Sequence, residues 1–214
     1  MHEQEGVIKF RFDHRHVPLD DNVSLSGLNA WRSVLFKLGL IGRDPARYGG
    51  LGYGNISIKP DPDDTAFIVS GTQTGHLEKL TREHYCRVLD VDLTHHALIS
   101  EGLSQPSSEA ITHACVYRHD RSIGSVIHVH CPEIWRHTQR LGLAFTSEEI
   151  AYGTHEMVLA VDDLFESERL KRNPIFSMLG HRDGIVAFGQ SVDQAAGLVI
   201  RTFSEALAID EPLE

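Results

Sequence analysis

Two histidines separated by one valine stand inside an apolar run, SVIHVHCPEIW, at residues 125–135. The run begins like a buried β-strand, on which successive side chains point to opposite faces. His128 and His130 are therefore expected on one face. Imidazole is a common zinc ligand, and two neutral rings side by side suit a shared cation. The spacing fits a half-exposed strand with water-facing histidines equally well.

A candidate helix start, PSSEAITH at residues 106–113, precedes this strand. Ser107 or Ser108 can cap the helix, which would gather backbone N–H groups and hydroxyls into an anion site. Glu109 is expected in the first turn, where the helix dipole favours its charge. Alone, the segment reads more simply as an ordinary helix start. Because the segment directly precedes the histidine strand in the sequence, however, it predicts a carboxylate near a metal, placed to transfer protons.

A third metal ligand has three candidates: His113, His155 in AYGTHEM and His181 in MLGHRDGIVAFG. His181 precedes a turn and a predicted strand at 185–188, which can lie beside the histidine strand. His14 and His16 repeat the spacing of one intervening residue. They are disfavoured as a metal site because no serine-capped glutamate lies near them.

These residues must be positioned by interleaved strands and helices, an order typical of the α/β or α+β class. We expect strands at 7–12, 56–59, 66–69, 86–91, 125–130 and 185–188, and helices at 26–40, 108–118, from Pro132 onward and at 192–209. The glycine-rich segments GYGNIS (52–57) and VSGTQTG (69–75) follow or connect strands. In isolation both are plain turns, which glycine and asparagine favour.

Composition limits the partners. The chain has 214 residues, which fits one domain with a sizeable core, and a net charge of −10. This charge argues against nucleic acid or an anionic membrane surface as a partner, but not against a small anionic substrate. Three scattered cysteines without a CxxC motif indicate reduced thiols and a cytoplasmic location. We see no membrane span or signal-peptide pattern.

Five motifs occur in order: GNIS (54–57), SGT (70–72), PSSE (106–109), HVH (128–130) and HRDGIVAFG (181–189). No motif is specific alone, but together the series resembles the class II aldolase/adducin family, from about Gly27 to Leu207. The resemblance implies a single three-layer α/β/α domain at 23–214 with a mostly antiparallel central sheet. Residues 1–22 would form an N-terminal extension. It also implies a homotetramer with active sites at subunit interfaces.

The resemblance assigns roles to particular residues. His128, His130 and His181 are the implied zinc ligands, and Glu109 is the implied catalytic acid/base. Tyr152 resembles a catalytic interface tyrosine of the family, although a packed aromatic explains it as well. The implied phosphate pocket consists of Gly54, Asn55, Ser70, Gly71, Ser107 and Ser108. Backbone N–H groups and small hydroxyls can hold phosphate without lysine or arginine.

The reaction implied by the resemblance is retro-aldol cleavage of a ketose phosphate to dihydroxyacetone phosphate and an aldehyde, through a zinc-stabilised enediolate. Epimerases, dehydratases and decarboxylases share this scaffold and stay open as alternatives. An adducin-like assembly domain lacks the metal ligands, so the three histidines and Glu109 count against it.

Two features depart from the family pattern. The usual Asn-His-Gly motif is replaced by GHRDG at residues 180–184, two residues longer before the final glycine. Aldolases of the family also use a tyrosine near the C-terminus, whereas no tyrosine follows Tyr152. Both departures bear on the reaction, and the second slightly favours a member other than an aldolase.

Overall fold

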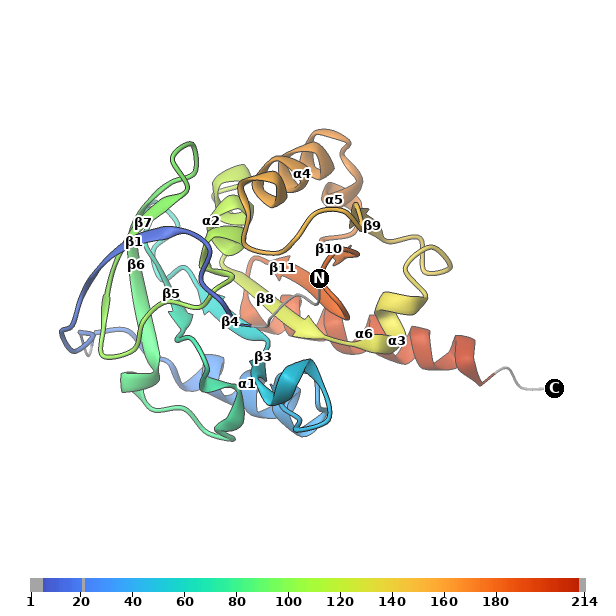
Figure 1. The fold of residues 1–214 in the computed structure, drawn as a ribbon, viewed down its shortest axis with the longest axis horizontal. Coiled ribbons are helices and arrows are strands. Elements are labelled where there is room, and N and C mark those ends of the chain that lie inside the picture. Colours follow the sequence, from blue (N-terminus) through green and yellow to red (C-terminus); the bar gives the residue numbers. More distant parts are fainter. Residues whose placement is uncertain (1–5, 21, 212–214) are drawn as a thin grey trace.

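The computed structural model describes residues 6–20 and 22–211. Its centre is a sheet of nine strands in the order β1-β7-β6-β5-β4-β8-β11-β10-β9 (Figure 1). The strands are β1 (Arg11–Arg15), β4 (Asn55–Ile58), β5 (Phe67–Ser70), β6 (Tyr85–Asp92), β7 (Ala97–Gly102), β8 (Ser125–His130), β9 (Ala144–Thr146), β10 (Ile175–Met178) and β11 (Gly184–Gly189). A separate pair joins β2 (Gly42–Arg43) to β3 (Gly52–Tyr53).

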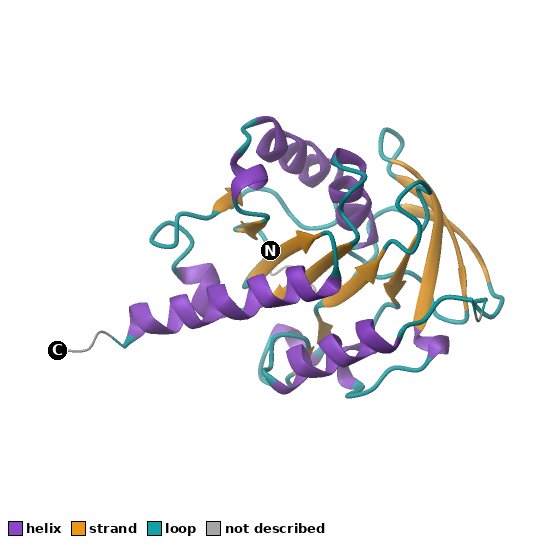
Figure 2. Ribbon diagram, turned by 180° about the vertical axis from the view of Figure 1, so that it is seen from behind, coloured by secondary structure: helices purple, strands orange, loops and turns teal. Residues whose placement is uncertain are grey.

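Helices lie on both faces of the sheet (Figure 2). They are α1 (Ser26–Lys37), α2 (Ala110–His119), α3 (Pro132–Arg136), α4 (His155–Glu166), α5 (Arg169–Arg172) and α6 (Val192–Asp210), with short 3-10 turns η1 (Tyr48–Gly50), η2 (Thr74–His76) and η3 (Arg82–His84). Helices α2, α4 and α5 contribute to one apolar core, and α1, α3 and α6 to the other. Among the described residues, no helix is long and apolar enough to cross a membrane.

The sheet is mixed, so the expectation of a mostly antiparallel sheet holds for its inner strands and is wrong at both edges. The six inner pairs are antiparallel, but the outermost pairs, β1 with β7 and β9 with β10, are parallel. Parallel neighbours need a long crossover connection, and α4 with α5 supplies it between β9 and β10. Strand β1 belongs to the expected extension and forms one edge of this sheet.

Strand β8 shows why the histidine spacing mattered. Val126 packs into the core on the α2 side, while Ile127 and Val129 pack into the core on the α6 side. Because side chains alternate along the strand, His128 and His130 point to the α2 side together with Val126. All six residues of β8 are buried.

Most expected elements are present, with shifted ends. Helix α2 begins at Ala110, two residues later than expected, so Glu109 occupies the N-cap position and not the first turn. The strand expected at 7–12 is instead β1, at Arg11–Arg15. Strands β2, β3, β7, β9 and β10 and helices α4 and α5 were not predicted. Strand β10 is a short, fully buried run without alternation, which periodicity cannot separate from a helix segment.

Candidate metal and anion site

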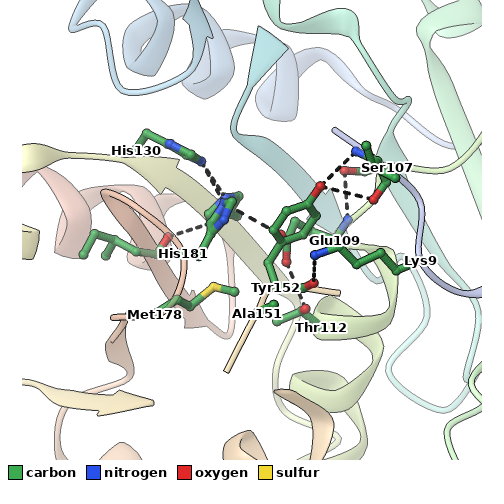
Figure 3. Close-up of polar contacts among 12 residues, drawn as sticks. Lys9, Ser107, Glu109, Thr112, His130, Ala151, Tyr152, Met178 and His181 are labelled. Atoms are coloured by element: carbon green, nitrogen blue, oxygen red, sulfur yellow. Dashed lines mark hydrogen bonds and ion pairs between the residues drawn. The ribbon is translucent and has the colours of Figure 1, made fainter. Parts of the chain in front are cut away.

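The imidazole rings of His128, His130 and His181 meet on the α2 side of the sheet. Figure 3 labels His130 and His181. His130 Nε2 lies 3.2 Å from His128 Nε2 and 3.1 Å from His181 Nε2. The three residues are at most 2 % exposed. Two zinc-bound nitrogens at tetrahedral geometry are separated by about 3.3 Å, so the observed spacing suits one shared cation.

The tautomer of His128 supports this fit. Its Nδ1 lies 3.2 Å from the carbonyl oxygen of Ile185, and a carbonyl can only accept a hydrogen bond. Nδ1 therefore carries the proton, and Nε2 presents a lone pair to the other two rings. His130 Nε2 carries at most one hydrogen when neutral, so it cannot donate to both neighbours. A cation among the three nitrogens would bind all three lone pairs.

Burial also keeps the imidazoles in their ligand form. It lowers the pKa of His128 and of His130 well below the ordinary value, and the neighbouring His181 lowers both further. Neutral imidazole is the form that binds a metal. His128 and His130 are therefore held in the form that can bind a divalent metal.

The sheet register positions these ligands. Gly184 of β11 pairs with His130, and Val186 pairs with His128. The turn between β10 and β11 presents His181, whose N–H donates to the Met178 carbonyl oxygen over 3.0 Å. Two antiparallel neighbours and one tight turn thus bring together ligands that are 51 residues apart in the chain.

Glu109 lies beside the histidines, at the start of α2 (Figure 3). Its Oε1 is 3.9 Å from His181 Nε2, and its Oε2 accepts a hydrogen bond of 2.9 Å from the Thr112 hydroxyl. The side chain is 1 % exposed. The Ser107 hydroxyl accepts the Glu109 backbone N–H at 3.3 Å, which fixes the approach of the chain to the helix.

Tyr152 touches the same group through its ring. The ring centroids of Tyr152 and His181 are 4.5 Å apart, and the tyrosine is fully buried. Its hydroxyl accepts the Val7 backbone N–H at 2.9 Å and donates to the Val7 carbonyl oxygen at 3.2 Å. Figure 3 shows this hydroxyl pointing away from the histidines. This arrangement favours the packed-aromatic interpretation of Tyr152.

A small polar hollow of about 20 Å³ lies near Glu109. Five of the six expected phosphate-binding residues line it: Gly54, Asn55, Gly71, Ser107 and Ser108. Ser70 is absent from its wall, and its hydroxyl accepts the Ile56 backbone N–H at 3.2 Å. Asn55 pairs with His128 in the sheet register, which connects the hollow to the histidine group.

The other candidate histidines lie elsewhere. His113 is buried with Nδ1 at 2.7 Å from the Ser57 hydroxyl, and His155 is exposed at the start of α4. His14 lies on the edge strand β1, where its Nδ1 is 3.0 Å from the Ser100 hydroxyl, and His16 is exposed. None of these four joins the three-histidine group.

Sequence reasoning missed a second group of residues at the histidines. The rings of Tyr48 and Tyr53 lie 4.5 Å and 5.3 Å from the His130 ring, measured between centroids. The Tyr48 hydroxyl donates to Asp183 Oδ2 over 2.6 Å. The lengthened GHRDG turn was a signal for Asp183, because it places an acidic residue two positions after a predicted ligand. No local pattern marked Tyr48.

The chain resembles a known protein family in sequence and solved structures in fold. Residues 45–206 match the model of the class II aldolase and adducin N-terminal domain. No curated protein matches the chain.

Solved structures share the fold at low identity. An L-fuculose 1-phosphate aldolase is 17% identical with a TM-score of 0.63, covering 92% of this chain and 91% of its own. A sugar-phosphate aldolase from Thermotoga maritima is 14% identical with a TM-score of 0.60, covering 88% and 95%. YgbL from Escherichia coli, whose name leaves aldolase, epimerase and decarboxylase open, is 20% identical with a TM-score of 0.58, covering 88% and 90%. The family model spans most of the chain, which therefore belongs to the class II aldolase and adducin family.

Proposed function

We propose that this protein is a zinc-dependent aldolase-type lyase that cleaves a ketose phosphate to dihydroxyacetone phosphate and an aldehyde. The observation that carries the proposal is the convergence of three buried histidine Nε2 atoms, with a buried glutamate 3.9 Å from one of them. A scaffold kept only for assembly has no use for such a costly set of buried polar groups.

His128, His130 and His181 would hold the metal. Three protein ligands leave a position open for substrate, as a catalytic zinc site requires. When bound, zinc supplies Lewis acidity, which stabilises negative charge on substrate oxygens. The hydrogen bond from His128 to Ile185 keeps that imidazole in the tautomer whose Nε2 can ligate.

Glu109 would move the proton. Retro-aldol cleavage removes a proton from the hydroxyl at the bond that breaks and returns one to the carbon that becomes free. The Thr112 hydroxyl holds one carboxylate oxygen of Glu109, which leaves the other facing the histidine group. A carboxylate fixed in this way can accept and return the proton without reorienting.

The polar hollow would bind the phosphate. Its wall consists of glycines, small hydroxyls and the side chains of Asn55 and Gln73, whose amide N–H groups could donate to phosphate oxygens. Gly54 adopts φ +75°, and a Cβ there would lie 2.8 Å from Ile41 Cγ1. A side chain at this position would therefore distort the wall. Because Asn55 stands beside His128, a phosphate in the hollow would place a short sugar chain over the histidines.

We also propose a homotetramer in which a neighbouring subunit completes each site. The hollow of about 20 Å³ is far smaller than a usual ligand pocket of roughly 300 Å³ or more.

The proposed location is the cytoplasm, because the three cysteines are buried as free thiols. The division into an extension at 1–22 and a domain at 23–214 stays a prediction.

Epimerase, dehydratase and decarboxylase activities form the alternative on the same site. The observation that favours these alternatives concerns which tyrosine hydroxyls are available as proton donors. No tyrosine follows Tyr152, and the Tyr152 hydroxyl is hydrogen-bonded to the Val7 backbone. An interface tyrosine as proton donor is therefore not evident in this chain. An adducin-like assembly domain is the second alternative.

Metal content per subunit tests the proposal first, on untagged protein purified without added metal. About one zinc in the wild type and little in His181→Ala is the expected result, since the variant lacks one of three ligands. Ketose 1-phosphates would then be screened for cleavage, epimerisation and loss of water. No metal in the wild type, even after zinc is offered, would contradict the lyase and favour the assembly domain.

A further inference from the structure

The turn that carries His181 is tied to a distant loop through Asp183. Tyr48, in the loop before β3, donates its hydroxyl to Asp183 Oδ2 over 2.6 Å. The Arg47 guanidinium lies 3.6 Å from the same oxygen and also donates to the Tyr48 hydroxyl. Residues 135 positions apart in the chain are thereby connected beside the histidine group.

The Asp183 carboxylate needs these partners. Its side chain is only 9 % exposed, and a buried charge costs stability unless it is paired and hydrogen-bonded. Arg182 also approaches, at 3.8 Å, but that side chain is 81 % exposed and held loosely. Tyr48 is the closest of these three partners to the carboxylate.

Tyr48 also contacts a second histidine. Its ring stands edge-on to the His130 ring, with centroids 4.5 Å apart and planes inclined by 74°. One residue thus touches His130 directly and, through Asp183, the turn that presents His181. The Asp183 backbone contributes as well, because its carbonyl oxygen accepts the Cys131 N–H at 2.8 Å, next to His130.

Tyr48 and Asp183 both have an unusual backbone conformation. Tyr48 has φ +50° and Asp183 has φ +64°, in the left-handed region that most side chains avoid. Such conformations persist where the surrounding contacts over-determine them. The hydrogen bond between Tyr48 and Asp183 is one of the contacts that hold these two conformations.

We propose that Tyr48 and Asp183 are positioning residues of the metal site. Their hydrogen bond, here called the latch, keeps the His181 turn against the Tyr48 loop and so keeps His130 and His181 at ligand spacing. The inference rests on the proposed function only in requiring a metal at the histidines. Neither residue is assigned as a ligand or as a group that touches substrate.

Zinc affinity of the full chain tests the latch, measured by competition with a chromophoric chelator. The variants are Tyr48→Phe, which keeps the ring on His130, and Asp183→Gly, which removes the accepting carboxylate while glycine tolerates the left-handed conformation. Their double variant completes the cycle. Tyr53→Phe is the matched control, because its ring also lies on His130 but its hydroxyl donates to the Gly39 carbonyl oxygen at 3.2 Å.

We expect each single variant to bind zinc about 10-fold more weakly, as is usual when a group that orients a ligand is lost. The double variant should be no weaker than the weaker single variant, and Tyr53→Phe should match the wild type. Three outcomes would contradict the proposal: a wild-type zinc affinity in Tyr48→Phe, losses of zinc affinity that multiply in the double variant, or an equal loss in Tyr53→Phe. A wild type that binds no zinc would contradict the proposed metal site itself. This result distinguishes a failure of the metal site from a failure of the latch alone.

Discussion

Gly184 leaves room for the His181 ring: a Cβ on Gly184 would lie 2.5 Å from His181 Cδ2. Contacts of this length do not occur between ordinary side chains, so the ring depends on the missing methyl group. Gly184 also pairs with His130 across β8 and β11. One glycine therefore sets the separation between two of the three histidines.

Gly184→Ala is expected to weaken zinc binding by about 10-fold or more, because a displaced ligand affects the metal at least as much as a lost orienting group. Zinc affinity and the zinc-free melting temperature would be measured together. Gly197→Ala is the matched control, since a Cβ on this α6 residue meets nothing within 4 Å. Equal zinc affinities in the two variants would contradict the dependence of His181 on Gly184.

Glu109→Gln is expected to keep zinc and lose turnover. The amide preserves the shape of the side chain but cannot accept the proton, and a lost general base costs about 100-fold or more in kcat. The measurement is kcat alongside zinc content, for whichever phosphorylated ketose proves to be the substrate. Glu148→Gln, at an exposed position, is the control. Unchanged turnover in Glu109→Gln would remove Glu109 from the proton transfer.

His130→Ala is expected to reduce zinc occupancy sharply, because it removes the ring whose Nε2 contacts both other ligand nitrogens. Elemental analysis after dialysis against a weak chelator gives the occupancy. His16→Ala is the control, since this exposed histidine is absent from the three-histidine group. Full occupancy in His130→Ala would place the metal elsewhere in the molecule.

Much of this site follows from local sequence, and the rest depends on tertiary contacts. The alternation around Val129 was enough to place His128 and His130 on one face, because strand geometry fixes it, but it left open whether that face is buried. The family motifs then selected His181 among three candidates. The fold class was also predictable, whereas the parallel outer pairs were not, since nothing local encodes which strands meet at a sheet edge.

Tyr48 shows the limit of such reasoning. Its contact with Asp183 joins two loops 135 residues apart, and no spacing rule reaches across that distance. Tyr152 gives the converse case, because the family resemblance implied a catalytic hydroxyl while a packed aromatic explained the residue equally well. The hydroxyl's orientation toward Val7 depends on where the N-terminal segment packs, which the motif does not contain.

The buried histidines predict that the zinc-free protein loses stability in acid. Burial lowers the pKa of His113 to about 3 in the folded protein, against about 6.5 in an unfolded chain. The pKa values of His128 and His130 are lowered in the same direction. As pH falls below 6.5, the unfolded state therefore binds protons first. The stabilisation is complete above that pH and is lost progressively below it.

Urea unfolding of the zinc-free protein between about pH 6 and pH 4 measures this loss, to which each such histidine contributes up to about 1.4 kcal/mol per pH unit. His113→Asn removes one titrating group while its amide can still bond to the Ser57 hydroxyl, the partner of Nδ1 in the wild type. The variant should therefore show a shallower decline in unfolding free energy with falling pH, whatever its stability at neutral pH. A decline as steep as in the wild type would mean that His113 takes up its proton in the folded state as readily as in the unfolded chain.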